Sequence, residues 1–205
     1  MNYNVELIKD ESYKPTFWSG GMATELITYP QNSDYASRNF LWRLGVAKID
    51  ILESTFSTLP QVLRKFMVIE GQIMLDHENK YKKSLTCFEQ DNFMGDWNTK
   101  TYGKASVFNL MTREKYQGEL IHINIPPRKL INFEYDTELN KDLIAICFYV
   151  TDGTFKTTLN NKEFKVNPSD LIKVDYINST FSHNFLLNND SSNIANIVAS
   201  VIYRS

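Results

Sequence analysis

The chain has 205 residues, of which 42% are hydrophobic and 22% are charged, and its net charge is -2. This composition is typical of a soluble globular protein, and the charge argues against the basic surface that generic nucleic-acid binding needs. No apolar run reaches the length of about 18 residues that spans a membrane, and the first ten residues lack the regions of a signal peptide. We therefore expect a cytoplasmic protein without a nucleic-acid or membrane partner.

Most of the chain consists of short β-branched and aromatic runs between Gly, Asn, Asp or Pro, which predicts an all-β fold. Two stretches, 66–75 and 148–157, share a pattern of strand, acidic-Gly turn and strand. A repeat of roughly 80 residues is too long for a solenoid and predicts two jelly-roll modules. We place the seam near Arg113–Gly118 and the modules at residues 1–114 and 115–205. Exposed edge strands would allow a homodimer.

The first segment with a chemical pattern runs from Phe17 to Leu26 and contains a Gly-Gly pair. Paired glycines let the backbone turn tightly or approach a ligand, while Trp18 offers a flat wall and Thr24 a hydroxyl. The alternative interpretation is a Gly-rich turn that leads into a strand over residues 24–29.

The next segment, residues 38–47, alternates as a strand does and places Arg43, Gly45 and Ala47 on one face. An arginine above two small residues leaves space over the sheet, which would suit a pocket floor. Arg43 could contact a ligand there, or it could form a structural salt bridge.

Residues 56–71 form the third pattern, in which alternation places Arg64 on one face with Phe66 and Val68. An arginine that points inward among apolar residues is costly unless it meets an acid or an anion. The residues alone predict either a buried ion pair with an internal Asp or Glu or an anion site.

The fourth pattern is the strand 107–113, where Asn109 and Met111 share a face. Its amide both donates and accepts hydrogen bonds beside a soft apolar surface.

The three histidines are far apart and none has the spacing of a metal-ligand pair. We place His77 in a polar loop and His122 in a strand over 119–125, where it could line a cavity. Cys87 and Cys147 both adjoin Phe in strand-like runs, so we expect two buried free thiols.

Together these segments resemble the HutD/Ves family in order and spacing, and specific motifs cover the chain up to Arg113. The motifs are Trp18–Gly21 with Thr24–Leu26, Tyr29–Pro30, Arg38–Ala47, Phe56–Pro60, Arg64–Gly71 and Phe108–Arg113. The resemblance implies a bicupin, which is two RmlC-like jelly-roll modules in one compact unit, without an established enzymatic activity. It also implies a link to histidine utilisation in some members and to cold and stress responses in others.

Metal-dependent cupins carry a His-x-His pair and a Glu at fixed distances before a Gly. Counting back from Gly71 puts Arg64 at the position of the Glu, and the two preceding ligand positions hold residues that are not usual metal ligands: Thr58 and Pro60, or Ser57 and Leu59. The resemblance therefore implies a metal-free pocket with Arg64 as its arginine. Two departures from the family pattern are Gln61, where relatives often have Gly, and Ser19, where many have Asn.

The resulting hypothesis is a metal-free cupin, without a cofactor, that binds a small carboxylate metabolite and has a regulatory or accessory role. The residues predicted to bind the ligand are Arg64, Asn109, Thr24, Trp18, Met111 and Arg43. One alternative is a metal-independent isomerase or epimerase in which His122 or Tyr29 moves protons. The other is a protein-interaction module without a ligand.

Overall fold

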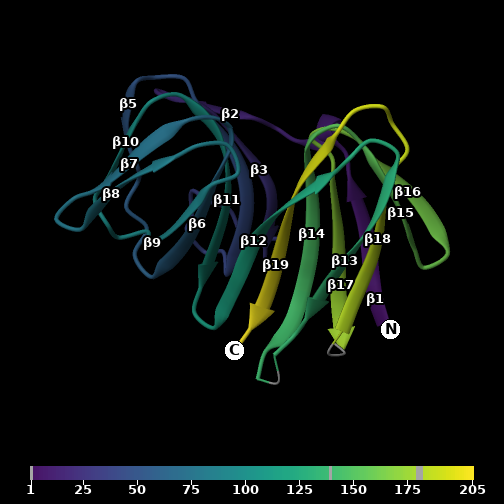
Figure 1. Ribbon diagram of the computed structural model, residues 1–205. Coiled ribbons are helices and arrows are strands. Elements are labelled where there is room, and N and C mark those ends of the chain that lie inside the picture. The colour runs from purple at the N-terminus through teal and green to yellow at the C-terminus, as the bar shows by residue number, and fades with distance from the viewer. Residues whose placement is uncertain (1, 139, 179–181) are drawn as a thin grey trace. The chain divides into compact units, whose positions relative to one another are not determined.

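The computed structural model describes residues 2–138, 140–178 and 182–205 (Figure 1). The described chain consists of strands, loops and one 3-10 turn, η1 (Asp10–Ser12), so the prediction of an all-β protein is confirmed. Within those ranges, no helix has the length and apolar character needed to cross a membrane. The chain divides into two compact units, which we call the central unit (Tyr13–Gln117) and the terminal unit (Met1–Ser12 with Gly118–Ser205).

The central unit contains a six-stranded and a four-stranded antiparallel sheet. The larger sheet has the order β2 (Thr16–Trp18), β3 (Gly21–Tyr29), β4 (Trp42–Ile49), β11 (Ala105–Arg113), β6 (Val62–Gly71) and β9 (Gln90–Met94). The smaller sheet has the order β5 (Glu53–Thr55), β10 (Thr99–Tyr102), β7 (Ile73–His77) and β8 (Tyr81–Leu85). Alternating apolar residues from both sheets, among them Phe66, Val68 and Leu75, form the buried core between them.

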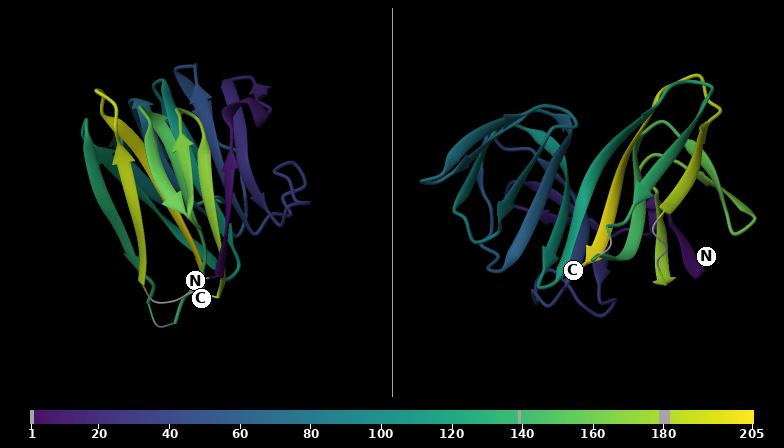
Figure 2. Two further views of the ribbon diagram at one scale, coloured as in Figure 1. Left: turned by 90° about the vertical axis from the view of Figure 1, so that its right-hand side faces the viewer. Right: turned by 60° about the horizontal axis from the view of Figure 1, so that its bottom comes forward.

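The terminal unit also contains two antiparallel sheets around one core (Figure 2). Its five-stranded sheet has the order β1 (Asn2–Ile8), β17 (Leu171–Asn178), β14 (Asp142–Asp152), β19 (Ala195–Arg204) and β12 (Tyr116–Ile125). Its four-stranded sheet has the order β13 (Lys129–Asp136), β18 (Ser182–Asn189), β15 (Phe155–Leu159) and β16 (Lys162–Val166).

The strand order repeats between the units. The series β4-β11-β6-β9 corresponds to β12-β19-β14-β17, and β5-β10-β7-β8 corresponds to β13-β18-β15-β16, so each strand matches the one eight places later. The two predicted acidic-Gly turns occupy matching places. Gly71 and Gly153 both have positive φ, and a Cβ on either would lie within 3 Å of a backbone oxygen just before the last strand of its unit. Only glycine fits both turns.

The units differ from the predicted modules in one respect. Their division falls at Gly118, inside the predicted seam, but the first twelve residues belong with the second half of the chain. The reason is that β1 pairs with β17 over its whole length. Asp170 fixes the end of β1, because its carboxylate accepts hydrogen bonds from Lys9 Nζ at 2.8 Å and from the Asp10 N–H at 3.0 Å.

Candidate functional site

Arg64 lies on the face of the larger central sheet that turns toward the unit's core. One register row crosses this sheet through Thr28 on β3, Arg43 on β4, Met111 on β11, Arg64 on β6 and Phe93 on β9. Because side chains two apart on a strand share a face, Arg64 follows Phe66 and Val68 inward. Only 6% of Arg64 is exposed to solvent.

The surroundings of the Arg64 guanidinium are aromatic. Its central carbon lies 4.4 Å from the centre of the Phe56 ring and 5.2 Å from that of Phe93. Its Nη2 donates one long hydrogen bond of 3.5 Å to Asn109 Oδ1, and its buried Nε has no hydrogen-bond partner among the described residues. Burial lowers the pKa of Arg64 from 12.5 to about 10; a favourable interaction with Tyr35 opposes this shift, and the positive charge of Arg43 adds to it.

Arg43 is also buried, with 8% of its surface exposed, but it has an acid partner. Its Nε donates to Glu25 Oε2 at 2.8 Å, which is the structural salt bridge that the sequence left open. The guanidinium lies over Gly45, because a Cβ built there would be 2.8 Å from Arg43 Nη1. Tyr35, from the loop between β3 and β4, stacks against it at 4.9 Å.

Both guanidinium groups approach the same part of the sheet. Asn109 pairs in register with Gly45 on one side and with Phe66 on the other, so the Arg43 and Arg64 groups flank its amide. A small apolar cluster lies beside them and includes Met111. Of the six predicted ligand-binding residues, the structure brings together Arg64, Arg43, Asn109 and Met111.

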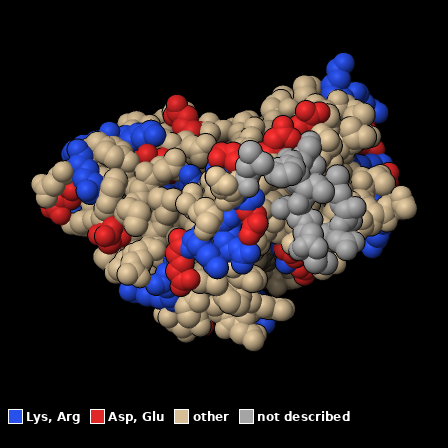
Figure 3. Space-filling model, turned by 90° about the horizontal axis from the view of Figure 1, so that it is seen from below, with Lys and Arg blue, Asp and Glu red and all other residues tan. Residues whose placement is uncertain are grey.

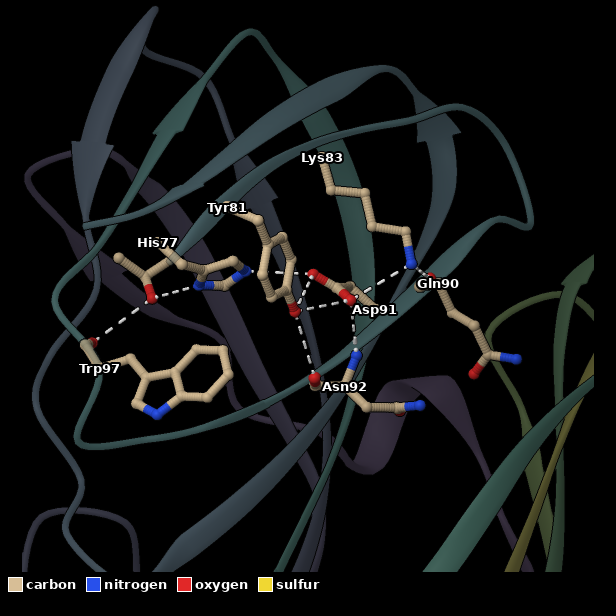
Figure 4. Close-up of polar contacts among 8 residues, drawn as sticks. His77, Tyr81, Lys83, Gln90, Asp91, Asn92 and Trp97 are labelled. Carbon is tan, nitrogen blue, oxygen red and sulfur yellow. Dashed lines mark hydrogen bonds and ion pairs between the residues drawn. The ribbon is translucent and has the colours of Figure 1, made fainter. Parts of the chain in front are cut away.

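The strand next to β6, β9, carries a buried acid, Asp91, that has partners other than Arg64. Asp91 lies two residues from Phe93, and Figure 4 shows its carboxylate surrounded by other donors. It contacts His77 Nε2 at 3.1 Å, the Tyr81 hydroxyl at 3.2 Å and Lys83 Nζ at 3.2 Å. No described Asp or Glu forms an ion pair with Arg64. The predicted alternative of a buried ion pair for Arg64 is therefore not what the structure contains.

A sequence model of the HutD family matches residues 10–189. The chain belongs to the HutD family. Among solved structures, it resembles a conserved protein of unknown function from Pseudomonas aeruginosa (14% identity, TM-score 0.79, 97% of this chain and 98% of the other). It also resembles HutD from Pseudomonas fluorescens in a formate condition (17%, TM-score 0.73, 98% and 100%).

A more distant fold relative of this HutD-family chain is the formate complex of Lactobacillus farciminis oxalate decarboxylase (6%, TM-score 0.67, 97% and 86%). At these low identities, the TM-scores show a shared cupin-like fold. No curated protein matches the chain in sequence.

Two predicted residues of the HutD motifs lie away from Arg64. Trp18 lies on the edge strand β2, where it pairs with Gly21 of β3, and its ring packs near Gly20 and Ile51. Thr24 pairs with Val46, so it lies on the sheet face opposite Arg43.

The proton-transfer candidates of the enzyme alternative are also elsewhere. Tyr29 stacks on Trp42 at 5.6 Å, on the sheet face opposite Arg43. His122 belongs to the terminal unit and contacts Asn196 Oδ1 at 3.0 Å. The strand positions on either side of His122, Ile121 and Ile123, pack on that unit's core, so His122 faces away from it.

Sequence reasoning was wrong about two other side chains. His77 is 1% exposed at the end of β7, where its Nδ1 contacts Thr99 Oγ1 at 2.8 Å, and it does not lie in a polar loop. The signal was available, because His77 follows Ile73 and Leu75 at strand spacing. Cys87 is exposed, and only Cys147 is a buried thiol.

A divalent metal does not fit the surroundings of Arg64, because the side chains there are a second arginine, an amide and a thioether. Throughout the described ranges, no three His, Cys, Asp or Glu side chains are grouped to hold a metal ion.

The terminal unit is apolar at the places that match Arg64, Asn109 and Asp91, although it buries polar side chains elsewhere, among them His183 and Asn189. Aligning Gly71 with Gly153 places Ile146 at the position of Arg64, and the strand pairings place Ala199 and Ile172 at those of Asn109 and Asp91. All three are fully buried and apolar.

On the face shown in Figure 3, basic and acidic side chains alternate and do not gather into one basic patch.

Proposed function

We propose that this HutD-family protein is a metal-free bicupin that binds one small carboxylate metabolite per chain, at Arg64 in the central unit. The observation that carries the proposal is a buried guanidinium without an ion-pair partner among the described residues. Keeping a charge out of water costs several kcal/mol, and a ligand carboxylate would offset that cost through two-pronged hydrogen bonds. The repeated strand order supports the bicupin assignment.

Asn109 would complete the recognition of the anion. Its Oδ1 faces Arg64, so its amide NH2 is directed elsewhere and can donate to the second carboxylate oxygen. Arg43 adds positive charge nearby, although Glu25 neutralises part of it. The aromatic rings of Phe56 and Phe93 exclude water from the guanidinium and favour a small, flat ligand.

The relatives support the class of ligand and the role. One HutD structure was determined in a formate condition, and an oxalate decarboxylase of the same fold type was determined as a formate complex. Family membership supports an accessory or regulatory part in histidine utilisation in the cytoplasm, with urocanate or formylglutamate as candidate ligands. Affinity should be modest, in the micromolar to millimolar range, because about 1.5 to 3 kcal/mol per charged hydrogen bond is offset by desolvation.

Calorimetric titration of chelator-treated protein with formate, urocanate, formylglutamate and malonate tests the proposal. We expect one of these to bind at one site per chain and Arg64→Met to abolish the heat. Gly45→Ala should weaken binding by about 5-fold, because the added Cβ displaces the Arg43 guanidinium. Arg204→Met is the matched control, since it removes a surface arginine paired with Asp142 in the other unit and should bind as the wild type does.

Equal binding by the wild type and Arg64→Met would contradict the proposal. Absence of binding of all four anions to the wild type would favour an interaction module. Conversion of a ligand during the titration, followed by NMR, would favour the isomerase alternative.

A further inference from the structure

Two free sheet edges of the terminal unit border an open groove. Strand β1 ends the five-stranded sheet and β16 ends the four-stranded sheet, and the hairpin β15–β16 lies at the margin of its unit (Figure 1). The groove has a volume of about 720 Å³. Its lining from β1 and the hairpin includes the apolar side chains Val5, Leu7, Leu159 and Phe164. The rest of the lining is polar or charged: Asn4, Asn160, Lys162, Glu163 and Lys165. A groove of mixed polarity beside an unpaired strand edge suits a partner that adds a strand.

The turn of the hairpin fixes which backbone groups of β16 are free. Asn160 and Asn161 both have positive φ, and Leu159 pairs with Lys162 across this two-residue turn. Such a turn closes on a hydrogen-bonded pair, and N–H and C=O groups then alternate between the two edges of the strand. Lys162, Phe164 and Val166 therefore direct their backbone groups to β15. Glu163 and Lys165 direct theirs to the free edge.

Self-pairing of β16 is complementary in charge. If two copies of the strand pair antiparallel about Phe164, Glu163 of each lies opposite Lys165 of the other. Both are residues with free backbone groups, so each pair can exchange two hydrogen bonds. Neither side chain forms an ion pair with a described residue, and Lys165 stands opposite Lys156 on β15. Lys156 is already paired with Asp190 at 2.7 Å, so a carboxylate across the edge would give Lys165 a partner of its own.

The other sheet edges do not offer this complementarity. Strands β1, β2, β5, β9 and β12 carry at most one Asp, Glu, Lys or Arg each, and β8 has only lysines. In β13, Lys129 is an odd number of positions from Glu134 and from Asp136, so opposite charges there lie on opposite faces. Within the described ranges, β16 is the edge whose sequence matches itself.

We propose that β16 is a homodimer interface, in which two copies of the chain join their four-stranded sheets edge to edge about a two-fold axis through Phe164. The two Phe164 residues stand opposite each other at the pair that is not hydrogen-bonded, and each ring stays packed in the core of its own unit. Lys162 is exposed at the strand's start, with its ammonium 5.0 Å from the centre of the Phe164 ring. Pairing about a two-fold axis occupies the β16 edge of both copies, so the assembly closes at two copies.

Sedimentation equilibrium of the full chain, over about 1 to 200 μM, tests the interface. We expect a monomer–dimer equilibrium for the wild type. Glu163→Lys and Lys165→Glu should each raise the dissociation constant by about 10-fold or more, because each creates two like-charge pairs. The double variant restores both pairs in reversed order and should return the constant to within about 3-fold of the wild type. Glu134→Lys, on the β13 edge of the same sheet, is the control and should change nothing.

A wild type that stays monomeric to 200 μM would overturn the proposal. So would a dimer that neither single variant weakens, or a double variant as weak as the single ones. Because the anion site lies in the central unit, a failure here is separate from a failure of carboxylate binding.

Discussion

Replacing Arg64 by Met should stabilise the central unit while it abolishes anion binding. The pKa of Arg64 falls from 12.5 to about 10 on folding, so the unfolded chain holds the proton more tightly than the native state does. At 1.36 kcal/mol per unit, the cost of keeping this charge buried is about 3 kcal/mol at neutral pH. The cost applies at every pH below 10 and declines as the pH rises toward 12.5.

Interactions lost with the guanidinium reduce the gain. The contacts with Phe56 and Phe93 are worth about 1 to 2 kcal/mol together, and the 3.5 Å bond to Asn109 contributes little. Methionine fills a similar space without a charge. The net expectation is a rise of about 1 to 2 kcal/mol in the free energy of unfolding.

Urea unfolding followed by tryptophan fluorescence reports on the stability of the central unit, because all three tryptophans lie in it: Trp18, Trp42 and Trp97. The midpoint should rise with an unchanged slope. Arg64→Lys keeps a buried charge and should not stabilise. A loss of more than 1 kcal/mol in Arg64→Met would refute the reasoning, since it would mean that the arginine serves the fold.

Three further predictions follow from the placement of other side chains. Trp18→Ala and Thr24→Val should leave carboxylate binding unchanged in the calorimetric titration, and a loss of about 5-fold or more in either would contradict the geometry. Burial acts to raise the pKa of Asp170, but hydrogen bonds to its carboxylate outweigh burial, so the pKa is lowered and the ionised carboxylate stabilises the fold. Asp170→Asn should lower the free energy of unfolding by about 2 kcal/mol at pH 7. This deficit should shrink as the pH falls below 3.8. Burial, together with nearby acidic charge, raises the pKa of both thiols. Iodoacetamide should therefore modify exposed Cys87 slowly at pH 7 and faster as the pH rises, whereas buried Cys147 should react only after unfolding. Rapid modification of Cys147 in the native protein would be inconsistent with its burial.

The fold and four of the six predicted site residues were accessible from the sequence, through local periodicity and the family motifs. Alternation placed Arg64 with Phe66 and Arg43 with Gly45, and neighbouring strands then brought Asn109 and Met111 beside them. The acidic-Gly turns located the repeat, since only glycine can face a carbonyl so closely.

The rest depended on long-range pairing, which periodicity does not encode. Trp18 and Thr24 are close to the motif in sequence, but an edge strand and an outward face separate them from Arg64. The sequence did not reveal whether Asp91 pairs with Arg64, because the partners that Asp91 has instead come from the strands β7 and β8. The pairing of β1 with β17, across almost the whole chain, is likewise visible only in three dimensions.

The two units differ at three matching places, which are polar in the central unit and apolar in the terminal unit, and this difference decides which substitutions each unit tolerates there. Exchanges among aliphatic residues of similar volume at Ile146, Ile172 and Ala199 alter only packing, and such exchanges usually cost less than about 1.5 kcal/mol. The matching places in the other half carry charge and hydrogen bonds that no aliphatic residue can replace. At these three places the terminal unit can therefore accumulate mutations, or be given a second specificity, without change to the carboxylate site that we propose in the central unit.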